Sequence, residues 1–303
     1  MTSGAGNLQR QLLVDVFAAV GATAVTARRA PVRRSRSIEF DYSATLSGWR
    51  ALRTRLEAAG FVPFRALRDG HHRFLIGHDR AGWVKVDVKL DRTGVAAEAG
   101  RFGTNLLWAF RRRRGPIVAI VGADGAGKST VVQGLVEGSP FAASPAYLGS
   151  RRHRPGASGR GRTARQGWRV LAGVIRWSIR SLVRLGSIHL KARGGQLVVC
   201  DRHPVEAGFL DRNTAGLAGA VRRTVARHLL PHPDRFILLT APGATLFARK
   251  GEHSPEALDA MNGALHSLIE WVGGTTVDAT RPADEVLSDV EDVVMRLIGD
   301  RLS

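Results

Sequence analysis

The stretch that decides the fold is Gly122-Ala123-Asp124-Gly125-Ala126-Gly127-Lys128-Ser129-Thr130. It matches the pattern G-x-x-x-x-G-K-[ST], in which glycines let the backbone curl so that successive N–H groups point at phosphate oxygens. The apolar run at 117–121 predicts a buried strand before the loop, and residues 129–136 predict a helix after it. A helix that begins here also presents its positive end to the phosphates. The stretch therefore predicts a phosphate-binding loop.

The residue types of this loop predict its chemistry. Lys128 is expected to bridge the β- and γ-phosphates of a triphosphate, and the Ser129 hydroxyl is expected to be a ligand of Mg²⁺. ATP and Mg²⁺ are therefore the predicted cofactors. The expected cofactor-binding residues are Gly122, Asp124, Gly125, Ala126, Gly127, Lys128, Ser129 and Thr130.

Strands and helices alternate beyond the loop. Short apolar runs predict strands at 197–200 and 236–239, and residues 275–277 are expected to form a further strand. Helical periodicity predicts helices at 165–191, 214–229, 243–250, 255–271 and 283–301. Residues 139–163, rich in Pro, Gly, Ser and Arg, are expected to form a loop. This alternation predicts an α/β fold with a parallel sheet flanked by helices.

The N-terminal part has a different pattern. Four arginines at 111–114 followed by Gly115-Pro116 would interrupt a helix, so we place a domain boundary between residues 1–114 and 115–303. Before this boundary the pattern predicts helices at 8–20 and 49–59 and strands at 38–42, 73–76 and 83–90. The last two strands are expected to pair as a hairpin, so the segment is predicted to be a small α+β domain.

Three acids of this domain have two explanations. Glu39 and Asp41 share one face of a predicted strand, and Asp87 lies on a later strand. Three such acids can hold two Mg²⁺ ions, a pattern that faintly resembles nucleotidyltransferases, although the usual Gly-Ser and Asp-x-Asp signature is absent. Ordinary alternation of polar and apolar residues gives the same pattern. The domain is thus either structural or a degenerate nucleotidyltransferase-like unit.

Composition excludes several classes of protein. The 303 residues include 44% hydrophobic ones, which is enough for a core and excludes wholesale disorder. The single cysteine, Cys200, excludes a disulfide framework and a Cys-rich zinc site. The sequence contains neither a secretory signal nor an apolar run of about 18 residues, so we expect a cytoplasmic protein without a transmembrane segment.

The charge is concentrated in one part of the chain. The formal net charge is +19, and no acid occurs between Glu137 and Asp201, where twelve Lys or Arg residues lie. Such a segment favours an anionic partner, although an arginine-rich composition alone would also produce it. The predicted helix at 165–191 is amphipathic and basic, so it could touch an anionic membrane. Its apolar stripe is expected to pack on the sheet instead, and consists of Trp168, Leu171, Ile175, Ile179 and Leu182.

Four segments resemble the thymidylate kinase family of P-loop nucleotide kinases. The loop is similar to the family's version, in which an aspartate corresponding to Asp124 precedes the second glycine. The other three segments are 197–203 (LVVCDRH), 233–242 (PDRFILLTAP) with RKGE at 249–252, and 277–280 (VDAT). The resemblance covers 115–303 and implies a P-loop kinase fold. It also implies transfer of the γ-phosphoryl group of Mg-ATP to a nucleoside monophosphate, such as dTMP, or to a related acceptor.

The resemblance also implies roles for individual residues. Asp201 would hold Mg²⁺ with Ser129 or orient the acceptor, Arg202 would clamp the acceptor phosphate, and Arg249 would neutralise the transferring phosphoryl group from a lid. The sequence is also compatible with a surface ion pair at Arg202 and a solvated helix end at Arg249. Together with Lys128 these are the expected catalytic residues. The family's Arg-Glu-Pro-Gly-Gly-Thr stretch, however, is replaced by YLGSRRHRP at 147–155, and Glu206 stands where a serine is expected. The acceptor therefore stays open.

Two further functions are compatible with the sequence. One is a P-loop kinase that acts on a non-nucleotide acceptor in polysaccharide or natural-product biosynthesis. The other is a nucleic-acid-binding ATPase, which is not favoured because no recognised nucleic-acid-binding module is present. The expected partner is a nucleotide or another phosphate-accepting small molecule, and the sequence leaves a homodimer open.

Overall fold

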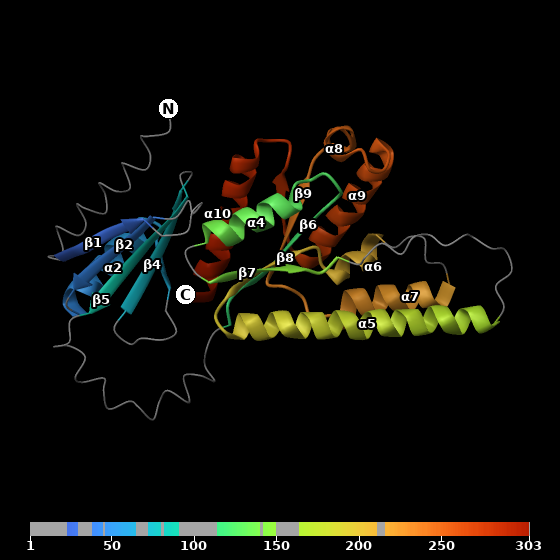
Figure 1. Ribbon diagram of the computed structural model, residues 1–303, viewed down its shortest axis with the longest axis horizontal. Coiled ribbons are helices and arrows are strands. Elements are labelled where there is room, and N and C mark those ends of the chain that lie inside the picture. The colour runs from blue at the N-terminus through green and yellow to red at the C-terminus, as the bar shows by residue number, and fades with distance from the viewer. Residues whose placement is uncertain are drawn as a thin grey trace, which may run out of the picture. The chain divides into compact units, whose positions relative to one another are not determined.

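The computed structural model describes residues 23–29, 38–44, 46–64, 72–79, 82–90, 114–139, 142–149, 164–210 and 216–302. Its strands form two five-stranded sheets (Figure 1). The chain divides into two compact units. One unit holds the first sheet with the second half of α4 (Lys128–Gly138) and most of α10 (Ala283–Leu302), and the other holds the second sheet. The predicted division between residues 114 and 115 stays a prediction.

The first sheet is mixed, with the strand order β1-β2-β5-β4-β3. Its strands are β1 Thr23–Arg29, β2 Ile38–Ala44, β3 Val62–Phe64, β4 His72–Asp79 and β5 Gly82–Leu90. Only β2 and β5 pair in parallel, and β4 and β5 form the predicted antiparallel hairpin. Helix α2 (Leu46–Ala58) contributes Leu52 and Leu56 to the core of this unit, to which β5 contributes Val84, Val86 and Val88.

The sequence pattern did not predict β1 or β3, and the helix predicted at 8–20 lies outside the described residues. Pairing of β2 with β5 places Asp41 opposite Asp87 and Glu39 opposite Lys85. Because residues two apart in a strand share a face, the three acids belong to one face of this sheet. This register agrees with the prediction that Glu39 and Asp41 share a face. By itself it gives the three acids no functional role.

The second sheet is entirely parallel, with the order β10-β9-β6-β8-β7. Its strands are β6 Ile117–Gly122, β7 Ala143–Tyr147, β8 Leu197–Asp201, β9 Arg235–Thr240 and β10 Thr275–Asp278. The helices that alternate with them are α4, α5 Ala164–Arg193, α6 Ala207–Leu210, α7 Gly216–Thr224, α8 Gly243–Lys250, α9 Pro255–Val272 and α10. The predicted α/β fold with a parallel sheet flanked by helices is confirmed.

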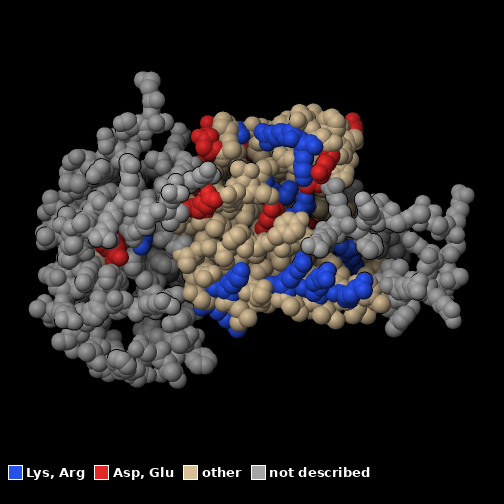
Figure 2. Space-filling view, viewed as in Figure 1, with Lys and Arg blue, Asp and Glu red and all other residues tan. Residues whose placement is uncertain are grey.

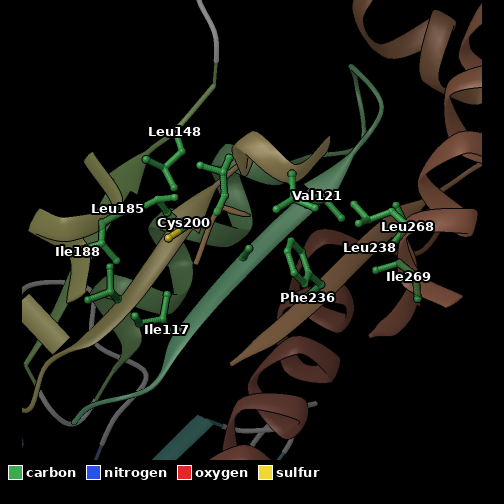
Figure 3. Close-up of a cluster of buried hydrophobic side chains, with 14 of the residues drawn as sticks. Ile117, Val121, Leu148, Leu185, Ile188, Cys200, Phe236, Leu238, Leu268 and Ile269 are labelled. Atoms are coloured by element: carbon green, nitrogen blue, oxygen red, sulfur yellow. The ribbon is translucent and has the colours of Figure 1, made fainter. Parts of the chain in front are cut away.

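The central strand β6 is buried on both faces. Ile117, Ala119 and Val121 pack in a cluster with side chains of β8 and β9, and helices α5 and α9 cover this cluster (Figure 3). Val118 and Ile120 project to the opposite face and are also fully buried. A strand enclosed in this way requires an uninterrupted apolar run, which residues 117–121 supply.

Asp234, the residue before β9, forms two hydrogen bonds with Ile117 at the beginning of β6. Its N–H donates to the carbonyl of Ile117 at 2.8 Å, and its Oδ2 accepts from the N–H of Ile117 at 2.7 Å. These paired bonds fix the register of the strand that leads into the phosphate-binding loop. Asp234 lies within one of the four segments that carry the family resemblance, and its role here is structural.

The expectation of a loop across 139–163 was wrong for residues 143–147, which form β7. The sequence there is Ala-Ser-Pro-Ala-Tyr, which has no apolar run that would predict a strand. β7 lies at the edge of the sheet, and its residues are partly or fully exposed. An edge strand accepts small residues and a proline such as Pro145, because only one of its sides pairs.

Helix α5 packs through a different face from the predicted one. Ile175, Ile179 and Leu182 of the predicted stripe are exposed, whereas side-chain placement at Trp168 and Leu171 is outside the described part. The packed face instead consists of Val174, Ser181, Leu185, Ile188 and Ala192, all buried. Both sets repeat at intervals of three to four residues, so the periodicity alone could not decide between them.

Two smaller differences concern the helices. The predicted helix at 214–229 ends as α-helix at Thr224 and continues as one π-helical turn, Val225–Leu229, before Pro231. A 3₁₀ turn, Pro204–Glu206, precedes α6. Among the described residues, no helix has the length and apolarity to cross a membrane.

Candidate active site

The phosphate-binding loop joins β6 to α4 and depends on two glycines. Gly125 and Gly127 have φ values of 91° and 82°, in the left-handed region that favours glycine. A Cβ at Gly125 would also lie 2.6 Å from the carbonyl oxygen of Leu246. α4 begins at Lys128, so the N–H groups of its first turn open onto the loop. The backbone thus has the shape expected of an anion cradle.

Lys128 is buried within the loop. Its ammonium group donates a 2.7 Å hydrogen bond to the carbonyl of Ala123. Burial and, to a smaller extent, Arg202 lower the pKa of Lys128 to about 8, against the opposing effect of nearby carboxylates. A charged group that is desolvated in this way gains from an anionic partner. Phosphate binding by Lys128 stays a prediction, with which its position in the loop agrees.

Ser129 and Asp201 come together from different elements. The hydroxyl of Ser129, in the first turn of α4, donates a 2.8 Å hydrogen bond to Oδ2 of Asp201 at the end of β8. The other carboxylate oxygen, Oδ1, is buried and has no hydrogen-bond partner among the described residues. A hydroxyl beside an incompletely paired carboxylate is a set of hard oxygen donors, which suits Mg²⁺. These two residues fit the predicted metal ligands.

Arg202 lies between two carboxylates. Its guanidinium group forms an ion pair with Asp124 of the loop, and its Nη1 lies 3.7 Å from Oε2 of Glu206. Burial opposes its charge, but Glu206 and Asp124 together hold the pKa of Arg202 above its usual range. Its backbone has a φ of 68°, which is uncommon for a residue other than glycine. The arginine is thus held tightly at the carboxyl end of the sheet.

Glu206 is fully buried in the same cluster. Its Oε1 accepts a 2.6 Å hydrogen bond from the N–H of His203. Burial raises the pKa of Glu206 to about 7, although Arg202 and Lys128 act in the opposite direction. A carboxyl group with this pKa changes its charge near neutral pH. Glu206 therefore contributes a variable charge within contact distance of Arg202.

His203 is buried as a neutral imidazole. Its Nδ1 accepts a hydrogen bond from the N–H of Val205 at 3.3 Å, and its ring packs edge-on against Phe236. Burial, together with the smaller effects of His232 and His189, lowers the pKa of His203 to about 3. The residue supports the turn after β8 and carries no charge at physiological pH.

Two side chains at the end of α8 and in the loop after it make separate contacts. Arg249, in the last turn of α8, donates to the carbonyls of Ala279 at 2.8 Å and Thr280 at 3.5 Å. Its hydrogen bonds among the described residues are thus with the segment after β10, and its part in catalysis stays a prediction. His253, in the loop after α8, places Nε2 3.7 Å from Oδ2 of Asp124.

The edge strand β7 leads to the same cluster. Tyr147 pairs with Asp201 in the sheet register, and the N–H of Leu148 donates to the carbonyl of Asp201 at 3.0 Å. A Cβ at Gly149 would lie 3.0 Å from Cδ of Arg202. The segment that replaces the family's acceptor-gripping stretch therefore begins beside Asp201 and Arg202, with the side chain of Tyr147 exposed.

The sequence predicted much of this cluster but missed two members. Lys128, Ser129, Asp201, Asp124 and Arg202 come together as a group linked by hydrogen bonds and ion pairs. Glu206 had appeared only as a departure from the family pattern. His253 gave no sequence signal, because a single histidine in a loop has no periodicity or motif. No group of three or more His, Cys, Asp or Glu in the described part of the chain could hold a metal ion.

Comparisons with known proteins add a structural similarity. No family model matches the chain, and no curated protein matches it in sequence. Thymidylate kinase from Candida albicans is a solved structure to which the chain is similar, with 16% sequence identity and a TM-score of 0.43. The match covers 63% of this chain and 94% of that chain.

Proposed function

We propose that the chain is an ATP-dependent phosphotransferase of the P-loop kinase type, using Mg²⁺. The observation that carries the proposal is the hydrogen bond between Ser129 and Asp201, which joins the phosphate-binding loop to the carboxyl end of β8. In open α/β sheets, ligands bind beyond the carboxyl ends of the strands. The loop, the buried ammonium of Lys128 and this oxygen pair occupy that position together.

Each of these residues has a different role in the proposed phosphoryl transfer. Loop N–H groups and Lys128 hold the donor phosphates in place, which is most of what catalysis of this reaction requires. Ser129 and Asp201 are the residues that would hold Mg²⁺, which supplies charge neutralisation at the transferring phosphates. Arg202 orients the acceptor. Arg249 secures the segment after β10 through its bonds to Ala279 and Thr280.

For the acceptor, we propose a nucleoside monophosphate, such as dTMP, or a related molecule. Arg202 supports this proposal, because a guanidinium group at the carboxyl end of β8 can bind a phosphate with two parallel hydrogen bonds. To do so it must release or share Asp124 or Glu206.

A second candidate is a non-nucleotide acceptor that presents a hydroxyl group without a phosphate. The observation that favours it is that two carboxylates already hold Arg202. Asp124 and Asp201 already balance the charges of Lys128 and Arg202, and Glu206 adds negative charge as pH rises through its pKa of about 7. An uncharged acceptor, such as the hydroxyl of a sugar, would avoid repulsion from these carboxylates.

An ADP-release assay with two acceptor panels tests both candidates. One panel contains nucleoside monophosphates, and the other contains sugars and other alcohols without phosphate. Turnover with the first panel supports the nucleotide kinase, and turnover confined to the second supports the alternative. Lys128→Met is the negative control. Binding of Mg-ATP without turnover on either panel contradicts the proposal of a kinase.

A further inference from the structure

Helix α5 has three distinct faces. One face packs in the core through Val174, Ser181, Leu185, Ile188 and Ala192. A second face is apolar and exposed, and at about 100° per residue its members fall within one side of the helix: Ile175, Ile179, Leu182, Val183 and Leu190. A third face, next to the second, carries positive charge through Arg176, Arg180, Arg184 and Lys191. We refer to the second face as the apolar stripe and to the third as the basic row.

The apolar stripe is exposed over several helical turns in the described part of the chain. Its five side chains are between 45% and 68% exposed among the described residues. Single exposed aliphatic residues are common on protein surfaces, but a contiguous row of them marks an interaction surface. The core face of the same helix is complete without them, since α5 already contacts β6, β8 and α7. The stripe therefore takes no part in the packing of α5 against these three elements.

The basic row determines which partner fits. Figure 2 shows Lys and Arg side chains following α5 along the side of the parallel-sheet unit where this helix lies. All four cations of the row are exposed, and the described residues provide no carboxylate within ion-pair distance of them. The sequence contributes no acid between Glu137 and Asp201, so nothing on this helix offsets the charge. The partner must therefore be anionic as well as apolar.

We propose that α5 docks on an anionic membrane surface, with the apolar stripe in the boundary between headgroups and acyl chains and the basic row against the headgroups. An aliphatic stripe beside a row of Arg and Lys is the arrangement of helices that lie in the plane of a membrane interface. Anionic lipid attracts each nearby cation, which adds to burial of the stripe. This proposal concerns a surface of the parallel-sheet unit and does not depend on the reaction at the phosphate-binding loop.

Charge and side-chain type disfavour two other occupants. A second copy of the chain, paired through the same face, would bring two basic rows close together, and like charges repel. Nucleic acid would satisfy the basic row, but single strands bind through stacking on aromatic side chains, and the stripe is aliphatic. A lipid surface offers an apolar environment to the apolar stripe and negative charge to the basic row.

Co-sedimentation of the full chain with lipid vesicles tests the proposal. We expect the wild-type protein to sediment with phosphatidylglycerol-rich vesicles and not with pure phosphatidylcholine, and added salt should weaken the binding. Ile179→Glu/Val183→Glu should lower the affinity for phosphatidylglycerol vesicles by about tenfold or more. Arg180→Gln/Arg184→Gln should lower it and reduce its dependence on salt. Because all four positions are exposed, thermal unfolding should be unchanged and serves as the check on folding.

Leu229→Glu is the matched control, since Leu229 is 65% exposed but lies outside α5. It should bind phosphatidylglycerol vesicles as the wild type does. Failure of the wild-type protein to bind these vesicles overturns the proposal, as does equal binding by Ile179→Glu/Val183→Glu. A wild-type dimer that this variant converts to a monomer, without vesicle binding, would assign the stripe to a second copy. Oligonucleotide binding that is lost in Arg180→Gln/Arg184→Gln, again without vesicle binding, would assign the basic row to nucleic acid.

Discussion

The Ser129 hydroxyl donates a 2.8 Å hydrogen bond to Asp201, 72 positions later in the chain, and so ties the phosphate-binding loop to the end of β8. Asp201→Asn keeps an acceptor oxygen for this bond but removes the negative charge that would attract Mg²⁺. We expect kcat to fall by about 10²–10³-fold, a loss typical of removing one group that stabilises the transition state. Steady-state kinetics with titration of Mg²⁺ measures this change.

ATP affinity in the absence of Mg²⁺ should be unchanged in Asp201→Asn. Glu270→Gln, which alters an exposed acid of α9, is the control and should behave as the wild type does. A wild-type rate and wild-type Mg²⁺ dependence in Asp201→Asn would show that this carboxylate holds no metal.

Lys128 should take up a proton when ATP binds at alkaline pH. Its pKa of about 8, lowered chiefly by burial, leaves most of the side chain neutral at about pH 9, and a bound triphosphate favours the charged form. The calorimetric enthalpy of ATP binding should therefore vary with the ionisation enthalpy of the buffer at that pH. Well below the pKa of Lys128 the side chain is already charged, so its contribution should vanish. Lys128→Met should abolish the effect and Lys250→Met should retain it.

Glu206 should make the protein less stable as pH rises toward neutrality. Burial raises the pKa of Glu206 from 4.5 to about 7, so the folded state binds more protons than the unfolded state between these values. The free energy of unfolding should decline across that range and then level off. Glu206→Gln should lack this decline. Across the range, the change in the free energy of unfolding should differ between the variant and the wild type by at most about 3 kcal/mol. Denaturant unfolding at a series of pH values measures it, and identical pH profiles for the two proteins would contradict the assignment.

Gly125→Ala should destabilise the loop, whereas Gly263→Ala should not. Gly125 has a φ of 91°, and a Cβ would lie 2.6 Å from the carbonyl oxygen of Leu246. We expect a loss of about 1–3 kcal/mol from the strained conformation alone, together with weaker ATP binding. Gly263, within α9, has no atom within 4 Å of the added Cβ, and alanine there should stabilise by about 0.5–1 kcal/mol. Equal unfolding midpoints for the two variants would show that the loop tolerates a side chain.

The parts that local pattern predicts are those in which one segment determines its own structure. The phosphate-binding loop belongs to this class, because its glycines, lysine and hydroxyl residues lie side by side in sequence and follow an apolar strand. β6, β8 and β9 were predicted for the same reason, since a buried parallel strand needs a continuous apolar run. Strand β7 was missed because an edge strand with Pro145 has no such run.

Features that depend on the rest of the molecule could not be predicted. Glu206 is buried against Arg202 because the 3₁₀ turn after β8 folds back, and the charged residue itself gives no sign of burial. In α5, two groups of residues repeat with helical spacing, the predicted stripe and the packed face. The position of the sheet determines which group is buried. His253 approaches Asp124 across 129 positions of chain, so no local spacing relates them.

The strand order of the parallel sheet has a consequence for synthesis on the ribosome. β6 is its central strand, but its neighbours β8 and β9 begin only at Leu197 and Arg235. At about 5–20 residues per second, the most apolar strand of the unit emerges many seconds before either neighbour. During that interval its open edges can pair with other nascent chains. The chain is therefore most exposed to aggregation while it is being made, and a chaperone that shields residues 117–122 until β9 appears would protect it.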